Sequence, residues 1–227
     1  MPKRAVIMVA GGTGTRMASK TAKQFLDLAG KPVIFHTFRA FYRFDPDLQF
    51  VLVLYPALRE EWQALVRAHR FDIPHVLTHG GAERFHSVKN GLAALDKDVE
   101  LVAVHDAVRP LVTAATIARS FAAAEKHGAA VPVIPVTDTI RQKENDGSKT
   151  LPRHTLVAVQ TPQCFRRKVI DEAYAAEYDP VFTDDASVAE RAGHYIRLCE
   201  GNRANIKITT PEDLAVSEAL MASGQNF

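Results

Sequence analysis

Short apolar runs alternate along this chain with longer amphipathic stretches, and this alternation constrains the fold more than any other feature. The apolar runs are rich in Val, Ile and Leu and show little polar alternation, as strands covered on both faces require. They span residues 5–10, 50–55, 73–78, 101–104 and 129–134. The stretches between them have the length and pattern of helices, at residues 33–44, 58–69, 84–95 and 114–127. Strands that alternate with helices predict an α/β fold with a mostly parallel, doubly wound sheet flanked by helices.

Two threonines mark helix starts. Thr113 directly precedes the stretch 114–127 and is a candidate N-cap. Thr210 has the clearer signal, because Pro211 suits the first helical position and two acidic residues follow it in the first turn. We expect this last helix to run to about Ala222.

Residues 135–156 break the alternation. The segment is polar, and Asn145-Asp146-Gly147 in its middle is a turn signal between two candidate strands. It predicts a projecting β-hairpin arm, for which a mobile surface flap is the simplest interpretation from the residues alone. No internal repeat or Pro/Gly-rich linker divides the rest, so residues 1–227 are expected to form a single domain with this arm.

Composition excludes several classes of function. The 28 Lys and Arg against 26 Asp and Glu leave a formal charge of +2, too small a surplus for a nucleic-acid groove or an anionic membrane surface. The first apolar run is far shorter than a signal peptide or a membrane span, so we expect a cytoplasmic protein. Cys164 and Cys199 lie in no metal-ligand pattern and are expected to be reduced thiols.

A glycine-rich loop, Gly11-Gly12-Thr13-Gly14-Thr15-Arg16-Met17, follows the first predicted strand. Backbone N–H groups can approach phosphate oxygens where side chains are missing. The loop lacks the Gly-Lys-Ser/Thr ending of a P-loop, and Met17 stands where the dinucleotide motif needs its third glycine. Instead it carries Arg16, with Lys20 and Lys23 just beyond, which suits a highly charged phosphate ligand. A tight turn without function is the alternative.

Asp106 ends the predicted strand at 101–104, at the edge where open α/β sheets bind ligands. It is a candidate to hold Mg²⁺ against phosphate oxygens. A helix N-cap or a salt bridge to Arg109 is the alternative. His105 beside it is expected to be structural. A second glycine turn, Gly80-Gly81, opens the helix that contains Ser87, where backbone groups and a hydroxyl could contact a base, or simply cap the helix.

Taken together, these segments resemble the 2-C-methyl-D-erythritol 4-phosphate cytidylyltransferases. Eight of them occur in the order found in that family and cover nearly the whole chain: AGGTGTRM, AKQFL with GKPVIFHTF, GGAERFHSV, VAVHDAVRP, DTIR, VQTPQCF, TDDA and NIKITTPEDL. The resemblance implies a Rossmann-like nucleotidyltransferase fold. It also implies an enzyme that transfers CMP from CTP to 2-C-methyl-D-erythritol 4-phosphate and releases pyrophosphate, with Mg²⁺ or another divalent cation as cofactor.

The resemblance also implies roles for individual residues. The catalytic cations would be Arg16, Lys23 and Lys207. The nucleotide would be bound by Ala10, Gly11, Gly12, Gly14, Gly81, Arg84 and Ser87. The sugar phosphate would be held by Asp106, Arg109, Thr161 and Thr183, together with Thr139 and Arg153 from the arm of a partner subunit, because family members form homodimers by arm exchange. Ala22 departs from the proline usual before Lys23, which puts the placement of that lysine in doubt.

Other functions were weighed against this one. A ribitol 5-phosphate cytidylyltransferase would share the fold and the CTP loop, although the serine of RFHSV and the arm motif favour methylerythritol phosphate. A nicotinamide dehydrogenase would need an acid after the second strand, where this chain has Leu54-Tyr55-Pro56. A non-catalytic nucleotide sensor would have little need for four charged groups around one triphosphate.

Overall fold

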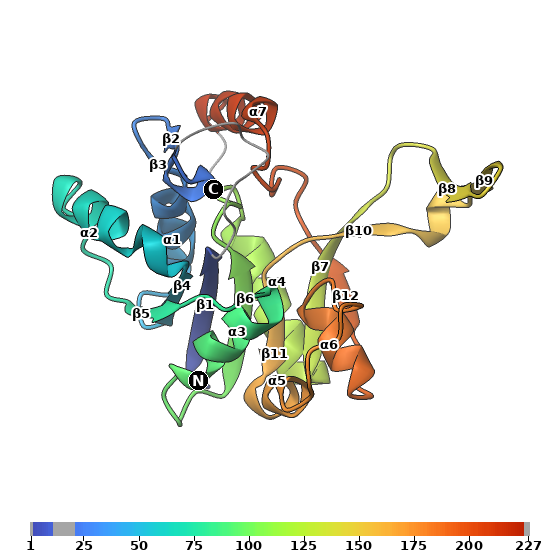
Figure 1. Ribbon diagram of the computed structural model, residues 1–227, viewed down its shortest axis with the longest axis horizontal. Coiled ribbons are helices and arrows are strands. Elements are labelled where there is room, and N and C mark those ends of the chain that lie inside the picture. Colours follow the sequence, from blue (N-terminus) through green and yellow to red (C-terminus); the bar gives the residue numbers. More distant parts are fainter. Residues whose placement is uncertain (1, 11–20, 225–227) are drawn as a thin grey trace.

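The computed structural model describes residues 2–10 and 21–224, and its centre is one twisted sheet (Figure 1). The strand order is β10-β7-β11-β6-β1-β4-β5, and β12 pairs with β7. β1, β4, β5 and β6 are parallel, whereas β10 and β11 run antiparallel to their neighbours. The strands are β1 (Arg4–Ala10), β4 (Gln49–Leu54), β5 (Val76–His79), β6 (Leu101–Asp106), β7 (Ala129–Pro135), β10 (Val157–Val159), β11 (Gln163–Arg166) and β12 (Arg197–Glu200).

Two hydrophobic cores lie on opposite faces of this sheet. Successive strand residues point to opposite faces, so Val6 and Met8 of β1 join one core while Ala5 and Ile7 join the other. The first core is covered by α1 (Val33–Phe44), α2 (Arg59–Ala68) and α4 (Ala114–His127). The second is covered by α3 (Arg84–Ala93), α5 (Arg167–Tyr174) and α6 (Asp185–Arg191). The predicted α/β fold with a largely parallel sheet flanked by helices is therefore confirmed.

The first half of the chain follows the expected alternation closely. α1 and α4 have the predicted bounds, and the side chain of Thr113 accepts a hydrogen bond from Thr116 N as the N-cap of α4. β5 begins at Val76 rather than at residue 73, after Pro74, which cannot donate to a ladder. β5 is also partly exposed, because it is the edge strand and only β4 pairs with it.

The elements after the arm were not predicted. β10, β11 and β12 are three or four residues long, and α6 has seven residues. β10 and β12 are largely exposed, so they lack the apolar run that identifies a buried strand. Their positions depend on pairing with β7, which is a contact between distant parts of the chain.

α7 (Pro211–Ala222) has the predicted start. Thr210 and Asp213 form a capping box, in which the Thr210 side chain accepts from Asp213 N and the Asp213 side chain accepts from Thr210 N. Leu214 and Met221 of α7 pack against a small core that contains Leu28 and Ile208. The segment before the helix is thereby held beside the ends of β1 and β6.

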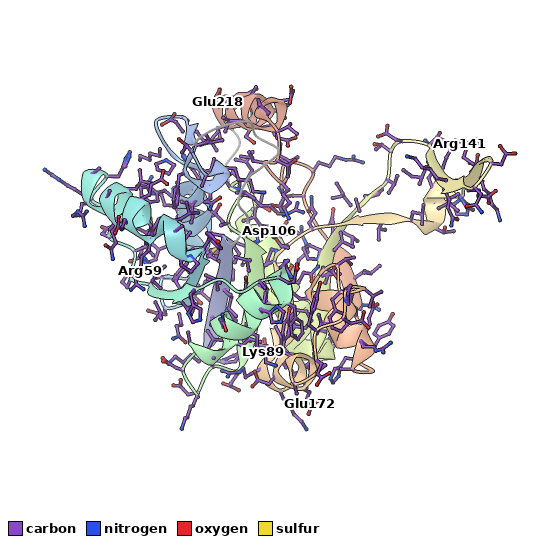
Figure 2. All side chains as sticks on the ribbon, in the orientation of Figure 1. Arg59, Lys89, Asp106, Arg141, Glu172 and Glu218 are labelled. Carbon is purple, nitrogen blue, oxygen red and sulfur yellow. The ribbon has the colours of Figure 1, made fainter. Side chains whose placement is uncertain are left out.

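The predicted hairpin arm is present. β8 (Ile140–Glu144) and β9 (Gly147–Leu151) pair with each other and form their own two-stranded sheet. The turn lies at Asn145-Asp146, and Gly147 after it has a φ of 116°, a conformation that favours glycine. The arm extends away from the central sheet (Figures 1 and 2). None of the helices within residues 2–10 and 21–224 has the length and apolar character needed to cross a membrane.

Candidate functional site

A cavity of about 540 Å³ opens at the carboxyl ends of β1 and β6, beside the start of α3. This is the edge where parallel α/β sheets bind ligands. Its lining residues come from five separate segments of the chain: Val9, Ala10, Lys23, Gln24, Tyr55, Gly81, Ala82, Glu83, Arg84, Ser87, Asp106, Val108 and Lys207. The structure therefore gathers seven of the predicted site residues around one cavity: Ala10, Lys23, Gly81, Arg84, Ser87, Asp106 and Lys207.

Asp106 is the meeting point of two cations in this cavity. Its Oδ2 atom lies 3.1 Å from Arg109 Nε and 3.1 Å from Lys207 Nζ. Burial alone raises the pKa of this carboxyl, but the neighbouring cations, led by Lys207, outweigh burial and hold its pKa well below the ordinary range. The carboxylate is therefore ionised, and the two cations around it leave a local surplus of positive charge.

Three short backbone links hold this cluster in place. Asp106 is the last residue of β6 and lies opposite Val9 in the parallel ladder with β1. The turn after it is closed by Arg109 N donating to Asp106 O at 3.1 Å. Ile208 N donates to Val108 O at 2.9 Å, which fixes the segment that carries Lys207. The predicted salt bridge between Asp106 and Arg109 is thus present, together with a lysine nearly a hundred residues away in the sequence.

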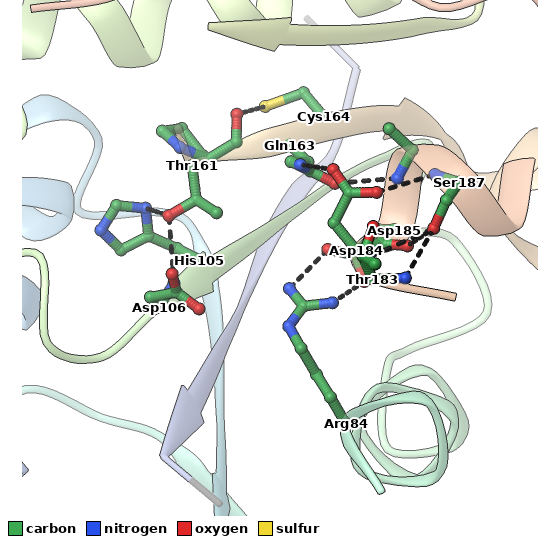
Figure 3. Close-up of polar contacts among 12 residues, drawn as sticks. Arg84, His105, Asp106, Thr161, Gln163, Cys164, Thr183, Asp184, Asp185 and Ser187 are labelled. Atoms are coloured by element: carbon green, nitrogen blue, oxygen red, sulfur yellow. Dashed lines mark hydrogen bonds and ion pairs between the residues drawn. The ribbon is translucent and has the colours of Figure 1, made fainter. Parts of the chain in front are cut away.

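His105 and Thr161 lie behind the cluster (Figure 3). His105 Nε2 is 3.1 Å from Arg109 O, and its Nδ1 is 3.0 Å from Thr161 Oγ1. The same hydroxyl accepts from Asp106 N at 3.2 Å. Burial lowers the pKa of His105 to about 4, so the ring is neutral at physiological pH.

On the other side of the cavity, Arg84 forms a bidentate pair with Asp185, the first residue of α6 (Figure 3). Arg84 Nη1 and Nη2 donate to the two carboxylate oxygens at 2.8 and 2.6 Å. Tyr174 Oη also donates to Asp185, at 2.7 Å. The pair connects α3, which borders the cavity, to α5 and α6. Burial by itself lowers the pKa of the Arg84 guanidinium, but Asp185 outweighs burial and raises it.

Small residues and backbone groups form the end of the cavity near α3. A Cβ atom at Gly81 would collide with the Cβ atom of His86, so only glycine fits there. Gly81 N donates to Ser87 Oγ at 3.0 Å, and this hydroxyl in turn lies 3.1 Å from Glu83 O, to which it donates. Buried Gln24 donates to Ala10 O at 3.1 Å and so fixes the end of β1.

The remaining predicted residues lie elsewhere. Gly11, Gly12, Gly14 and Arg16 fall outside the residues that the structure describes. Thr183 lies just before the N-cap of α6, and its N–H donates to Ser187 Oγ at 3.1 Å. Thr139 and Arg153 are carried by the arm, where Arg153 Nη1 donates to Thr137 O at 2.8 Å. Neither of these two lines the cavity within one chain.

Several residues at the site were not singled out from the sequence. Asp185 and Tyr174 orient Arg84, and Gln24 and Tyr55 line the cavity. The TDDA segment contained a usable signal for Asp185, because Asp184 is a strong N-cap residue and caps α6 here. Tyr174 carries no such signal, because a tyrosine in an amphipathic stretch is usually a core residue.

Asp106 is the described residue most suited to a divalent cation. Nowhere in residues 2–10 and 21–224 do three or more His, Cys, Asp or Glu side chains gather as a metal-binding cluster. This suits Mg²⁺, which proteins usually hold through one or two carboxylates together with substrate phosphates and water. Both cations contact Oδ2 of Asp106, so a metal ion would approach Oδ1.

Comparison with known proteins agrees with this site. Residues 4–223 match the family model of 2-C-methyl-D-erythritol 4-phosphate cytidylyltransferase. The protein of that name from Bacteroides thetaiotaomicron is 48% identical over 219 residues, which cover 96% of this chain and 100% of the relative. The crystal structure of the Thermus thermophilus protein of that name has 32% identity and a TM-score of 0.76, covering 97% of this chain and 99% of the other.

A second solved structure, 4-diphosphocytidyl-2C-methyl-D-erythritol synthase from Anaerococcus prevotii, gives a TM-score of 0.82 at 26% identity and covers 97% of this chain and 98% of the other. The family match spans both cores, the cavity and the arm, and it includes every motif segment seen in the sequence. The chain therefore belongs to the family of 2-C-methyl-D-erythritol 4-phosphate cytidylyltransferases.

Proposed function

We propose that this enzyme transfers CMP from CTP to 2-C-methyl-D-erythritol 4-phosphate, giving 4-diphosphocytidyl-2-C-methyl-D-erythritol and pyrophosphate for isoprenoid synthesis. The observation that carries the proposal is the convergence of Lys207 and Arg109 on Asp106, at a cavity whose other end is made of Gly81 and Ser87. One end suits phosphates and the other suits a small base. Both substrates carry phosphates that do not cross membranes unaided, so we place the enzyme in the cytoplasm.

The reaction needs positioning and charge neutralisation more than a strong base. A phosphate oxygen of the acceptor, already anionic at neutral pH, attacks the α-phosphorus of CTP. The bond from that phosphorus to the bridging oxygen breaks, and pyrophosphate leaves with the electron pair. No proton has to be removed from the nucleophile. His105 is buried and bonded at both ring nitrogens, so it is not needed as a base.

Cations would stabilise the charge that develops on the α-phosphate. We assign this role to Lys23 and Lys207, which both line the cavity, and to Arg16 in the glycine loop with Gly11, Gly12 and Gly14. Ala10, Gly81, Arg84 and Ser87 would hold the cytidine end, where the small residues leave room for a pyrimidine.

Mg²⁺ is the proposed cofactor, held by Asp106 and the phosphates of CTP. When bound, it would neutralise phosphate charge and orient the triphosphate for in-line attack. Arg109 and Lys207 fix the carboxylate that would receive it.

The acceptor phosphate would be held by Arg109 and Thr183 of one subunit and by Thr139 and Arg153 of its partner. The support for a homodimer by arm exchange is that the arm pairs only with itself and projects from the sheet, so Arg153 lies away from the cavity in its own chain (Figure 2). An arm that reaches a second subunit would complete two composite sites.

The acceptor is tested by following pyrophosphate release from CTP and Mg²⁺ with methylerythritol phosphate or ribitol 5-phosphate in parallel. We expect release with methylerythritol phosphate. Release with ribitol 5-phosphate alone would move the chain to the pentitol phosphate enzymes. No release with either would contradict catalysis and favour a nucleotide sensor.

Arm exchange is tested by mixing two inactive variants. Lys207→Met damages the cavity but keeps the arm, and Arg153→Ala damages the arm but keeps the cavity. After subunit exchange, mixed dimers should contain one intact site, restoring about a quarter of wild-type activity. Mixing Lys207→Met with Asp106→Asn, both in the cavity, should restore nothing. Failure of the first mixture to recover would exclude sites shared between subunits.

A further inference from the structure

The residues around Asp106 form a closed circuit of hydrogen bonds. Starting from the imidazole, the members are His105 Nε2 to Arg109 O, Arg109 Nε to Asp106 Oδ2, Asp106 N to Thr161 Oγ1, and Thr161 Oγ1 to His105 Nδ1. His105 and Thr161 are 0% and 5% exposed, so water does not compete for these bonds. A buried circuit in which each bond holds the next fixes the orientation of all its members.

The circuit also determines where the hydrogens lie. A carbonyl oxygen can only accept, so Nε2 of the neutral His105 ring carries the hydrogen that bonds to Arg109 O. Nδ1 is then the acceptor, and the hydroxyl of Thr161 donates to it. The single hydrogen of this hydroxyl is used inside the protein, while its oxygen receives the N–H of Asp106.

A second path joins the same groups from the C-terminal side. Arg109 Nη1 donates to Asn205 O at 2.8 Å, and Asn205 Nδ2 donates to Thr161 O at 2.7 Å. Asn205 is fully buried and lies two residues before Lys207. Thr161 therefore contacts both the strand that carries Asp106 and the segment that carries Lys207.

We propose that His105 and Thr161 are positioning residues, which fix the Asp106 carboxylate and the Arg109 guanidinium from behind and do not touch the acceptor. This differs from the direct phosphate contact that the family resemblance implies for Thr161. The proposal rests on the proposed function of the Asp106 cluster. Arg109 and Lys207 meet the phosphate, and Thr161 acts through them.

The first experiment compares Thr161→Val, which keeps the shape and removes both bonds, with Thr161→Ser, which keeps the hydroxyl. Losing this orientation should lower kcat/KM for the acceptor about tenfold, with the KM of CTP within about twofold of wild type. Thr161→Ser should restore most of the activity. The matched control is Thr116→Val in α4, a buried threonine whose hydroxyl bonds to Asn202 and not to the cluster. Loss of activity equal to that of Thr116→Val would overturn the proposal.

A double-mutant cycle separates positioning from direct contact. His105→Leu breaks the circuit at a residue that cannot reach the acceptor, because its side chain is fully buried. If both residues act through one circuit, the double variant should lose little more than the worse single variant. Additive losses would mean that Thr161 contacts the acceptor independently, and they would overturn the proposal.

An NMR measurement on the free enzyme does not depend on which acceptor is used. In wild type, the Nε–H signal of Arg109 should exchange slowly with water, because this group is bonded to Asp106. Thr161→Val should make it exchange faster, whereas Thr161→Ser and Thr116→Val should not. An unchanged signal in Thr161→Val would overturn positioning even if the enzyme proved to use a different acceptor. A changed signal with no transfer to methylerythritol phosphate would support positioning and reject only the proposed reaction.

Discussion

Two arginine–aspartate pairs flank the same cavity, and they differ in how their charges balance. Arg84 and Asp185 form a one-to-one bidentate pair, with Asp185 fully buried and bonded to Tyr174 as well. Asp106 instead faces two cations, Arg109 and Lys207, and the lysine side chain is 41% exposed. The first pair is balanced and suits a fixed structural connection. The second keeps a surplus positive charge beside the cavity, where an anionic substrate can use it.

The largest effect should come from unbalancing the first pair. Asp185→Asn leaves the Arg84 guanidinium without its counter-charge, and breaking a buried pair in this way costs about 3–5 kcal/mol. Urea unfolding measures this loss directly. The matched control is Asp171→Asn, which breaks an ion pair with Arg167 at a half-exposed position and should cost less than about 1 kcal/mol. Equal losses in the two variants would show that the Arg84 pair has no special weight.

The next effect should appear in the dependence of stability on pH and concerns the neutral ring behind Asp106. Because the pKa of His105 falls from 6.5 to about 4 on folding, the unfolded chain takes up this proton first as the pH drops. Stability is therefore fully present above pH 6.5 and is lost as the pH falls toward 4, by about 3 kcal/mol at 1.36 kcal/mol per pKa unit.

Unfolding free energies of wild type and His105→Leu, measured between pH 4 and 7, check this expectation. The variant should lose this part of the slope, whereas a substitution of exposed His127 with Gln should keep it. Parallel curves for wild type and His105→Leu would contradict a neutral, buried imidazole.

A smaller effect, on catalysis rather than folding, should come from removing the surplus charge of the second pair. Lys207→Met leaves Asp106 paired with Arg109, so the fold should be kept, while kcat/KM should fall about 10²-fold, or about 2.7 kcal/mol. Steady-state pyrophosphate release measures it. Lys168→Met, at a side chain 86% exposed on α5, serves as the control and should leave the rate unchanged. Full activity of Lys207→Met would mean that the surplus charge has no role.

The smallest effect should come from an arginine outside both pairs. Arg141 in the arm donates to Ser148 Oγ at 2.7 Å and to Thr150 Oγ1 at 2.8 Å, and all three residues are exposed. Arg141→Ala should change the free energy of unfolding by less than about 0.5 kcal/mol. A change above about 1 kcal/mol would show that the arm is packed more firmly than its exposure suggests.

Local signals predicted those elements whose residues carry their own pattern. β1, α1, α4 and the N-cap of α7 appear where hydrophobic periodicity and capping residues placed them. The Asn145-Asp146 turn is also local, because a hairpin connection depends on the residues within it. β12 was missed because its exposed residues form a strand only by pairing with β7.

The sequence by itself determined the α/β alternation, the hairpin arm and the family, because periodicity, turn residues and ordered motifs can be read without knowing which segments meet. It also marked Asp106 as the end of a strand. Only the tertiary structure decided that Lys207 and Arg109 share its carboxylate, that Asp185 holds Arg84, and that His105 and Thr161 close a circuit behind the cluster. These contacts join residues from 3 to 101 positions apart, and short-range pattern does not specify which distant side chains meet.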